Sequence, residues 1–447
     1  GVTGKMHYPL NVEGYRIVTW RAWNEAADRL AEGLAQRGLK AGDILVTRMH
    51  IRPEWAIASA AAGKLGLRLL GLNWHLTPTE TQYVLANSGA RAVICDDREP
   101  DALLPAFEGL PLLFVCSVDV ASSKFVPFAE LQATSPAAPR VAQANPRLIL
   151  YTSGTTGLPK GVVMGGGEGP MSPDAQRELL EYQMSVAGRG GFSAGKEVIF
   201  VTMPMHHGAG PALIWGGTAS GSKMVLLRRF DPEEALRLIQ EHRITRWTGV
   251  PTMYKRIAGL PRNVIAKYDV SSLRSLGVGA APASQALKEW IVSTFGDILS
   301  EGYGTTENGM ITYLPAGMQK KKPGSCGVPH AHVSVRIRDA QGHDVPAGTE
   351  GEIWVKTPVT IRGYLNAGAL GADALATVSQ QAAEHLGPLQ HLADRALHQM
   401  SEAEEALYAE LATSGSAAWT QLHGTVTSQL TAEVALPEGT QHLAMAA

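Results

Sequence analysis

The sequence has few cysteines and lacks a long apolar run. The three cysteines, Cys95, Cys116 and Cys326, are scattered and form neither a C-x-x-C pair nor an even-numbered framework. This distribution excludes a secreted disulfide scaffold and favours a reducing, cytoplasmic compartment. No apolar stretch approaches the roughly 20 residues that cross a bilayer, and the N-terminus lacks a signal-peptide pattern. We therefore expect no transmembrane segment. The chain begins with Gly rather than Met, which indicates that it starts inside a longer one.

Net charge is also nearly absent. The chain has 39 basic and 41 acidic residues among 447, so it has no overall field to attract nucleic acid or an anionic membrane. Single cores rarely grow past about 250–300 residues, so a chain of this length should have more than one domain. Chemistry on a small molecule is the function class that these features favour.

Alternating helical and strand-like segments predict an α/β protein. Residues 20–34 have apolar side chains at helical spacing, a short apolar run follows at 44–49, and the same order recurs through residue 95. Such alternation indicates a largely parallel sheet covered by helices. Further strands are predicted at 147–151, 198–202, 223–227, 275–278, 333–337 and 351–355, and helices at 232–242 and 284–295. Residues 127–146 are predicted to form a surface connection.

A Gly- and Thr-rich segment follows the strand predicted at 147–151. It reads Thr152-Ser-Gly-Thr-Thr-Gly-Leu-Pro-Lys160-Gly161, which combines backbone amides freed by glycine, hydroxyl donors and one positive charge. Those are the parts of a phosphate-binding loop. A Walker A loop is excluded, because Pro159 stands at the second glycine and Gly161 at the Ser/Thr position. The alternative is an ordinary flexible loop.

Together with other motifs in a fixed order, this segment resembles the ANL superfamily of adenylate-forming enzymes, and in particular AMP-forming acyl-CoA synthetases. The further motifs are Pro204-Met-His-His207, Gly277-Val-Gly-Ala-Ala-Pro282, Tyr303-Gly-Thr-Thr-Glu307, Gly324-Ser-Cys-Gly327, and Gly351-Glu352 leading to Gly363-Tyr364. The resemblance covers residues 10 to 366. It implies a large N-terminal domain with parallel sheets covered by helices and a small β-rich subdomain.

The resemblance implies a role for each motif. The phosphate-loop residues Thr152, Ser153, Gly154, Thr155, Thr156, Gly157 and Lys160 would hold the β- and γ-phosphates of ATP, with Thr156 and Lys160 also catalytic. The turn Gly279-Ala280-Ala281-Pro282 would lie against adenine, and Tyr303, followed by Gly304, would stack on that ring. Thr306 would meet the α-phosphate and Glu307 would bind Mg²⁺, a cation that prefers oxygen ligands.

Other interpretations of these residues remain open. His207 matches the family's histidine beside the carboxylate substrate, although a histidine pair is often a plain surface feature. Glu307 alone would be read as a solvated loop carboxylate. Trp215 and Trp247 are candidates for the acyl pocket or for the core.

The reaction implied is the attack of a carboxylate, expected to be a fatty acid, on ATP, followed by transfer of the acyl group to coenzyme A. ATP, Mg²⁺ and coenzyme A are the expected cofactors and co-substrates, and the pattern leaves room for a homo-oligomer. An acceptor other than coenzyme A is compatible with the same motifs. The competing hypothesis is a non-catalytic nucleotide- and acyl-binding remnant with a helical interaction module.

The match ends near residue 366. Residues 367–447 contain no Thr-Gly-Asp ribose motif and no Pro-Lys-x-x-x-Gly-Lys segment, so the family's usual C-terminal domain is missing and turnover is expected to be impaired. Residues 369–400 carry a helical stripe of leucines, and Ser401 with Glu404 forms a capping-box pattern. We expect a domain 1–366 followed by an all-α tail 367–447. The tail faintly resembles the helical N-terminal region of oligoendopeptidase F-type peptidases, without a His-Glu-x-x-His zinc motif; a gene junction or a helical cap would both explain it.

Overall fold

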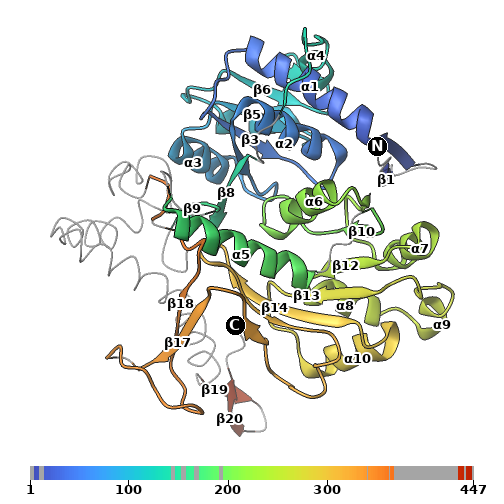
Figure 1. Ribbon diagram of the computed structural model, residues 1–447, viewed down its shortest axis with the longest axis vertical. Coiled ribbons are helices and arrows are strands. Elements are labelled where there is room, and N and C mark those ends of the chain that lie inside the picture. Colours follow the sequence, from blue (N-terminus) through green and yellow to red (C-terminus); the bar gives the residue numbers. More distant parts are fainter. Residues whose placement is uncertain are drawn as a thin grey trace.

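The computed structural model describes residues 5–9, 15–141, 146–152, 158–165, 171–190, 195–339, 341–361, 363–366, 431–436 and 439–444. Two large sheets with helices between and around them make up most of this structure (Figure 1). The sheets are rich in parallel strands, so the predicted α/β class is confirmed.

The first sheet has seven strands in the order β7-β6-β5-β3-β4-β8-β9. Every neighbouring pair is parallel except β8 and β9, which are antiparallel. The strands are β3 (Ile44–Arg48), β4 (Arg68–Gly71), β5 (Ala92–Cys95), β6 (Phe114–Ser117), β7 (Val126–Pro127), β8 (Arg147–Thr152) and β9 (Lys160–Val163). Its helical segments are α1 (Trp20–Gln36), α2 (Pro53–Leu65), α3 (Pro78–Ser88), the 3₁₀ turn η1 (Pro100–Ala106) and α4 (Phe128–Leu131).

The second sheet has nine strands in the order β16-β15-β14-β13-β12-β10-β11-β1-β2. Its centre is parallel and both edges are antiparallel. The strands are β1 (Lys5–Pro9), β2 (Tyr15–Thr19), β10 (Val198–Val201), β11 (Lys223–Leu226), β12 (Arg246–Gly249), β13 (Ser275–Val278), β14 (Leu299–Thr305), β15 (Gly309–Leu314) and β16 (Val328–Pro329). The accompanying helices are α5 (Pro173–Gly190), α6 (Ala209–Ala219), α7 (Pro232–His242), α8 (Pro251–Ala258), α9 (Arg262–Ile265) and α10 (Gln285–Phe295).

The predicted helices begin where local capping favours them. At α3, the Thr77 side chain accepts from the Glu80 amide while Glu80 accepts from the Thr77 amide, a reciprocal capping box. At α7 and α10, the side chains of Asp231 and Ser284 accept from amides of the first helical turn. These side chains satisfy amides that the first helical turn leaves unpaired, so the sequence places the helix starts accurately.

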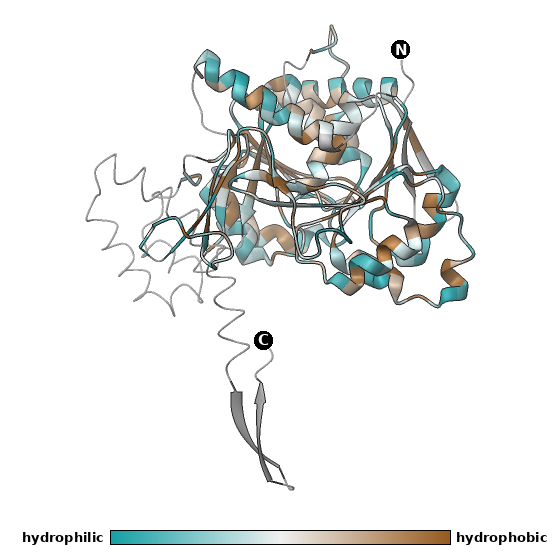
Figure 2. Cartoon of the chain, turned by 60° about the horizontal axis from the view of Figure 1, so that its bottom comes forward, coloured by the Kyte–Doolittle hydropathy of each residue, from teal (hydrophilic) through white to brown (hydrophobic). Residues whose placement is uncertain are grey.

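The largest core cluster lies between the two sheets. It contains Leu45 and Leu69 of the first sheet and Ile199 and Leu226 of the second, together with apolar residues of α1, α2 and α6. Trp55 of α2 is fully buried there. A second cluster packs α7, α8 and α10 on the other face of the second sheet, and a third packs α3 on the first sheet. Figure 2 shows the matching hydropathy, with hydrophilic residues on outward helix faces.

Two smaller strand pairs complete the described structure. β17 (Ser334–Arg338) pairs with β18 (Glu352–Lys356), matching the predicted small β-rich subdomain. β19 (Thr431–Leu436) pairs with β20 (Gly439–Ala444), so the all-α expectation for the tail is wrong over these residues. Cross-strand pairing can override a weak local helical tendency, which explains the error. The helices predicted between 369 and 411 lie outside the described residues.

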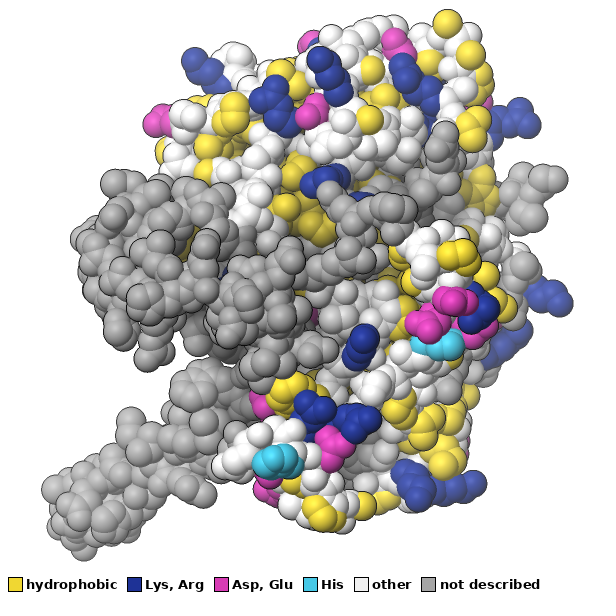
Figure 3. Space-filling model, turned by 60° about the vertical axis from the view of Figure 1, so that its left-hand side comes forward, with side chains coloured by type: hydrophobic (Ala, Val, Ile, Leu, Met, Phe, Trp, Pro, Cys, Tyr) yellow, Lys and Arg dark blue, Asp and Glu magenta, His cyan; other side chains and the backbone are white. Residues whose placement is uncertain are grey.

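The described surface carries charges of both signs. Figure 3 shows one face of the molecule. Over the described part of this face, Lys and Arg side chains are interspersed with Asp and Glu side chains. No helix among the described residues is both long and apolar enough to cross a bilayer.

Candidate active site

Thr152 and Lys160 are held opposite each other by the antiparallel β8–β9 pair of the first sheet. They are Cα partners at the end of the β8–β9 ladder. Tyr83 of α3 donates to the carbonyl of Pro159, 3.1 Å away, which fixes the last residue before β9. Ser153, Gly154, Thr155, Thr156 and Gly157 lie outside the described residues, and their phosphate-binding role stays a prediction.

Tyr364 lies between two of the predicted catalytic groups. Its hydroxyl donates to Oε1 of Glu307 over 3.2 Å, and Nζ of Lys160 lies 5.0 Å from the centre of its ring. Burial and the neighbouring Glu307 carboxylate raise the pKa of Tyr364 to about 12, so it is a neutral donor at physiological pH. The sequence predicts Lys160 and Glu307 from separate motifs, and Tyr364 connects them.

The segment that carries Tyr364 is tied to both sides of the site. The Leu365 amide donates to the Gly161 carbonyl over 2.7 Å. Leu365 thereby forms an isolated antiparallel bridge with Gly161 of β9. A Cβ at Gly161 would lie 3.0 Å from the Tyr151 ring and 3.1 Å from Leu365, so a larger residue there would require these side chains to shift by a few tenths of an ångström. At the other side, the Ile361 amide donates to the Glu307 carbonyl over 3.0 Å. The β9 strand and the Glu307 turn are therefore held in one unit.

Glu307 and Thr306 occupy the tight turn between β14 and β15. Asn308, which is buried, fixes this turn because its amide nitrogen donates to Thr305 and its side-chain oxygen accepts from Thr360 over 2.8 Å. The Thr357 hydroxyl also donates to the Asn308 carbonyl. The carboxylate of Glu307 is half-buried and faces Tyr364. Sequence reasoning missed the role of Asn308. The one feature that could have indicated it is its position directly after the motif Tyr303–Glu307.

The predicted adenine strip follows the neighbouring strand. Gly279 comes directly after β13, and a Cβ there would lie 3.2 Å from the Gly302 carbonyl of β14. Ala280 has a φ of 64°, a left-handed conformation that turns the chain away from the sheet, and Ala280, Ala281 and Pro282 are exposed. Tyr303 of β14 is half-buried, and burial raises its pKa. An exposed strip of small residues therefore stands beside the tyrosine that was predicted to stack on adenine.

His206 and His207 lie at the start of α6, where the two sheets approach each other. Burial, reinforced by nearby histidines, lowers the pKa of His206 to about 3, and burial also lowers the pKa of His207. Their ring centres are 4.5 Å apart. Both rings are therefore neutral at pH 7, so a substrate carboxylate here would meet hydrogen-bonding imidazoles rather than cations.

Carboxyl ends of strands from both sheets meet at this place. A Cβ at Gly71, the last residue of β4, would lie 2.6 Å from the Met205 carbonyl, so only glycine permits the approach. A Cβ at Gly208 would lie 3.7 Å from Leu150 of β8 and 3.8 Å from Met164, just beyond β9. Ligands of open parallel sheets bind at carboxyl ends of strands. Thr152 ends β8, and Gly279 and Glu307 follow β13 and β14, whereas Lys160 begins β9.

Residues 2–365 match the family described as AMP-binding enzyme. The chain belongs to the AMP-binding enzyme family. It is 31% identical over 360 residues to a feruloyl-CoA synthase from Amycolatopsis sp, with 78% of this chain and 67% of that protein covered. It is 29% identical over 353 residues to an indoleacetate–CoA ligase from Aromatoleum aromaticum, with 76% and 65% covered. This AMP-binding enzyme thus spans about two thirds of the length of those relatives, and its class is that of AMP-forming acid–CoA ligases.

Solved structures agree with this assignment. ATP-bound MatB from Rhodopseudomonas palustris has a TM-score of 0.66 at 25% identity, with 79% of this chain and 67% of that chain covered. A luciferase-like enzyme from Zophobas morio shares the fold at a TM-score of 0.67 and 21% identity, with 78% and 81% covered. The predicted superfamily is therefore confirmed for the AMP-binding enzyme described here.

An ion-pair cluster beside the site joins the two sheets of the AMP-binding enzyme. Burial alone would raise the pKa of Asp96, but His50, Arg52 and Arg228 outweigh it and hold that pKa below its ordinary value. Arg52 and His50 follow β3 of the first sheet, whereas Arg228 follows β11 of the second and donates to Asp96 over 2.9 Å. Sequence reasoning missed this cluster, because no motif marks side chains that meet only through folding.

The candidate site of the AMP-binding enzyme fits a Mg²⁺ ion that is bound partly by Glu307 and partly by phosphates of ATP. Glu307 offers one half-buried carboxylate, and the described residues contain no cluster of three or more His, Cys, Asp or Glu that could hold a metal by themselves. Mg²⁺ is commonly bound by one or two carboxylates together with substrate phosphates. Glu307 would therefore hold the ion jointly with ATP.

Proposed function

We propose that this enzyme uses ATP to activate a carboxylic acid as an acyl-adenylate and transfers the acyl group to coenzyme A. The observation that carries the proposal is the unit in which Tyr364 connects Lys160 to Glu307, at the carboxyl edge where His207 also lies. Lys160 and Glu307 lie on either side of Tyr364, and His207 and Glu307 follow strands β10 and β14 of the same sheet. The family and its acid–CoA ligase relatives support the same reaction.

Each residue has a role that its chemistry allows. The carboxylate oxygen of the acid attacks the α-phosphorus of ATP and pyrophosphate leaves, so negative charge must be neutralised on both sides of that phosphorus. Lys160 would hold the β- and γ-phosphates, and Thr306 would donate to the α-phosphate. Mg²⁺ held by Glu307 supplies Lewis-acid stabilisation when bound. The thiol of coenzyme A then attacks the acyl carbon, and AMP leaves.

His207 would orient the acid. Because burial keeps its pKa low, the neutral ring can donate one hydrogen bond to the carboxylate and still leave that oxygen anionic and nucleophilic. The phosphate loop 152–157 would cradle the triphosphate, and the Gly279–Pro282 strip with Tyr303 would receive adenine. All of these assignments are proposals.

Two kinds of evidence bear on which carboxylic acid the enzyme activates: the family resemblance and the acids for which its relatives are named. A fatty acid is the expectation from the family resemblance, and one relative, 27% identical over 364 residues, is a fatty acid–[acyl-carrier-protein] ligase from Streptomyces coeruleorubidus. Feruloyl-CoA synthase and indoleacetate–CoA ligase are named for aromatic acids, and both are more similar to this chain. We therefore propose an aromatic acid first and a fatty acid second.

ATP–pyrophosphate exchange tests the adenylation step without requiring coenzyme A. The assay compares ferulate, 4-coumarate, indoleacetate, hexanoate and palmitate on the purified chain, with Lys160→Ala as the site variant and Lys356→Ala, an exposed strand lysine, as the control. We expect acid-dependent exchange, fastest with an aromatic acid and at least tenfold slower in Lys160→Ala. Absence of both exchange and ATP binding by calorimetry would refute the proposal, and binding without exchange would favour a non-catalytic remnant.

A further inference from the structure

A buried ion pair connects helix α10 to strand β14. Nζ of Lys288 donates to the carboxylate of Glu301, and the two side chains are only 5% and 9% exposed. Taking two charges out of water is costly, and a buried ion pair often stabilises a fold no more than apolar side chains of similar volume do. Stability alone therefore does not explain why two charged residues stand here.

Lys288 is tied to the segment that was predicted to lie against adenine. Only Ala283 separates the Gly279–Pro282 strip from Ser284, the residue that caps α10. The Lys288 amide donates to the Ser284 carbonyl over 3.1 Å, within the first turn of the helix. A displacement of Lys288 would therefore move the start of α10 and, with it, the end of the strip.

Glu301 is tied to the tyrosine that was predicted to stack on adenine. Glu301 and Tyr303 are alternate residues of β14, so their side chains point to the same face of the sheet. The register between β14 and β15 stays regular from Glu301 to Tyr303, and the irregularity of this strand pair comes only after Tyr303. A displacement of Glu301 would therefore be transmitted along the strand to Tyr303.

The backbone pairing between β13 and β14 ends at this point. Its last Cα partners are Val278 and Glu301, and the strip turns away from the sheet at Ala280, whose φ is 64°. The ladder therefore does not determine how far the strip lies from Tyr303. The Lys288–Glu301 pair is a side-chain link between α10, which follows the strip, and β14, which carries Tyr303.

We propose that Lys288 and Glu301 are positioning residues that set the spacing between the Gly279–Pro282 strip and Tyr303. A charge-assisted hydrogen bond favours one geometry, whereas flexible apolar side chains of the same volume can pack in several. The pair acts on ATP through the strip and Tyr303. The inference rests on the proposed function, because that function assigns adenine to this place.

The test replaces both charges at once. Lys288→Met/Glu301→Met keeps the buried volume and leaves no charge unpaired, so the protein should fold, and thermal unfolding verifies this. We expect calorimetry to show ATP binding at least fivefold weaker than in the wild-type chain. In ATP–pyrophosphate exchange with the fastest acid of the panel, KM for ATP should rise at least fivefold, while kcat and KM for the acid stay within twofold.

Glu301→Asp provides a second variant that retains the ion pair. It keeps the charge but draws the carboxylate back by one methylene group, so α10 and β14 must approach each other to restore the contact. ATP binding should weaken at least twofold, because the spacing changes although both charges remain.

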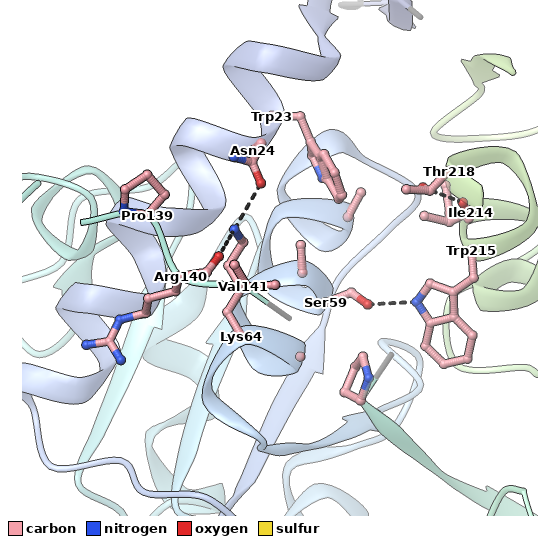
Figure 4. A pocket seen from close by; sticks show the side chains of 14 residues that line it. Trp23, Asn24, Ser59, Lys64, Pro139, Arg140, Val141, Ile214, Trp215 and Thr218 are labelled. Atoms are coloured by element: carbon pink, nitrogen blue, oxygen red, sulfur yellow. Dashed lines mark hydrogen bonds between the residues drawn. The ribbon is translucent and has the colours of Figure 1, made fainter. Parts of the chain in front are cut away.

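The matched control is another buried lysine–carboxylate pair. Nζ of Lys64 in α2 donates to Asp28 of α1 over 2.8 Å, and these side chains are 6% and 7% exposed. Figure 4 shows Lys64 with its hydrogen bond to Asn24 of α1. Neither helix carries a predicted nucleotide-binding residue. Lys64→Met/Asp28→Leu should therefore leave the affinity and the KM for ATP within twofold of wild type.

Three outcomes would overturn the proposal. One is an ATP affinity within twofold of wild type in Lys288→Met/Glu301→Met. Another is an equal loss of ATP affinity in the control variant, which would reveal a general effect of removing a buried pair. The third is a rise in KM for the acid as large as the rise for ATP.

The proposed function can fail independently of this inference. A wild-type chain that binds ATP without exchange would refute the function and still allow the comparison of ATP affinities. Unchanged ATP binding in the double variant, beside normal exchange by the wild type, would refute only the positioning role.

Discussion

The Tyr364 hydroxyl donates to the Glu307 carboxylate over 3.2 Å, and Nζ of Lys160 lies 5.0 Å from the centre of the Tyr364 ring. One side chain therefore positions the predicted metal ligand and the predicted phosphate ligand relative to each other. A charge-assisted hydrogen bond of this kind is worth more than a neutral one, and the cation–π contact adds a smaller contribution.

Tyr364→Phe removes the hydrogen bond to Glu307 and retains the ring beneath Lys160. We expect kcat/KM for ATP in pyrophosphate exchange to fall roughly tenfold, mainly through KM, because a hydrogen bond to a charged group is worth about 1.5–3 kcal/mol. The control is Tyr268→Phe, which removes a similar hydrogen bond to Glu233 on the outer helices. Equal KM values in the two variants would exclude a positioning role for Tyr364.

Glu307→Gln keeps the shape and the acceptor oxygen but removes the charge. We expect at least about 100-fold slower exchange, since a lost electrostatic contact to the reacting phosphates commonly costs several kcal/mol. Higher Mg²⁺ concentrations should recover part of the rate. Glu350→Gln, at an exposed position, is the control and should behave as wild type. A Glu307→Gln enzyme with wild-type rate and Mg²⁺ dependence would remove Glu307 from the site.

His206→Phe should make stability less sensitive to acid. The pKa of His206 falls to about 3 through burial, so below its ordinary value near 6.5 the unfolded chain takes up a proton that the folded chain refuses. The free energy of unfolding is therefore lost as the pH falls from 6.5 toward 3. Between pH 7 and 5, urea unfolding should show a loss about 1–2 kcal/mol smaller in His206→Phe.

The same comparison between pH 7 and 8 provides the control, because a histidine that is mostly neutral in both states contributes little slope there. Identical acid sensitivity of the two proteins between pH 7 and 5 would show that His206 takes up a proton in the folded state.

Gly71→Ala should destabilise the contact between the sheets. The added Cβ would lie 2.6 Å from the Met205 carbonyl and 3.0 Å from Cα of His206, so the start of α6 must move. We expect a loss of about 1–3 kcal/mol in urea unfolding and slower exchange. Gly188→Ala on α5 meets nothing within 4 Å and should leave stability unchanged or slightly higher. Equal stabilities would contradict the close approach.

The sequence by itself predicted much of the scaffold. The helix 232–242 and the strand 275–278 have the bounds that the sequence predicts, because capping residues and apolar periodicity are local signals. Strands β1 and β2 were missed, since each forms only by pairing at a sheet edge. The strand pair β19 and β20 was missed for the same reason.

For the site, the sequence determined which residues have the right chemistry: Lys160, His207, Thr306 and Glu307 all come from motifs. Only the tertiary structure decided that Tyr364 bridges Lys160 and Glu307, that Asp96 joins the sheets through Arg228, and that Trp215 of α6 donates to Ser59 of α2. These contacts connect residues far apart in the chain, and their geometry depends on the packing of two sheets around α2 and α6. Local patterns specify elements, whereas burial and close approach between elements specify partners.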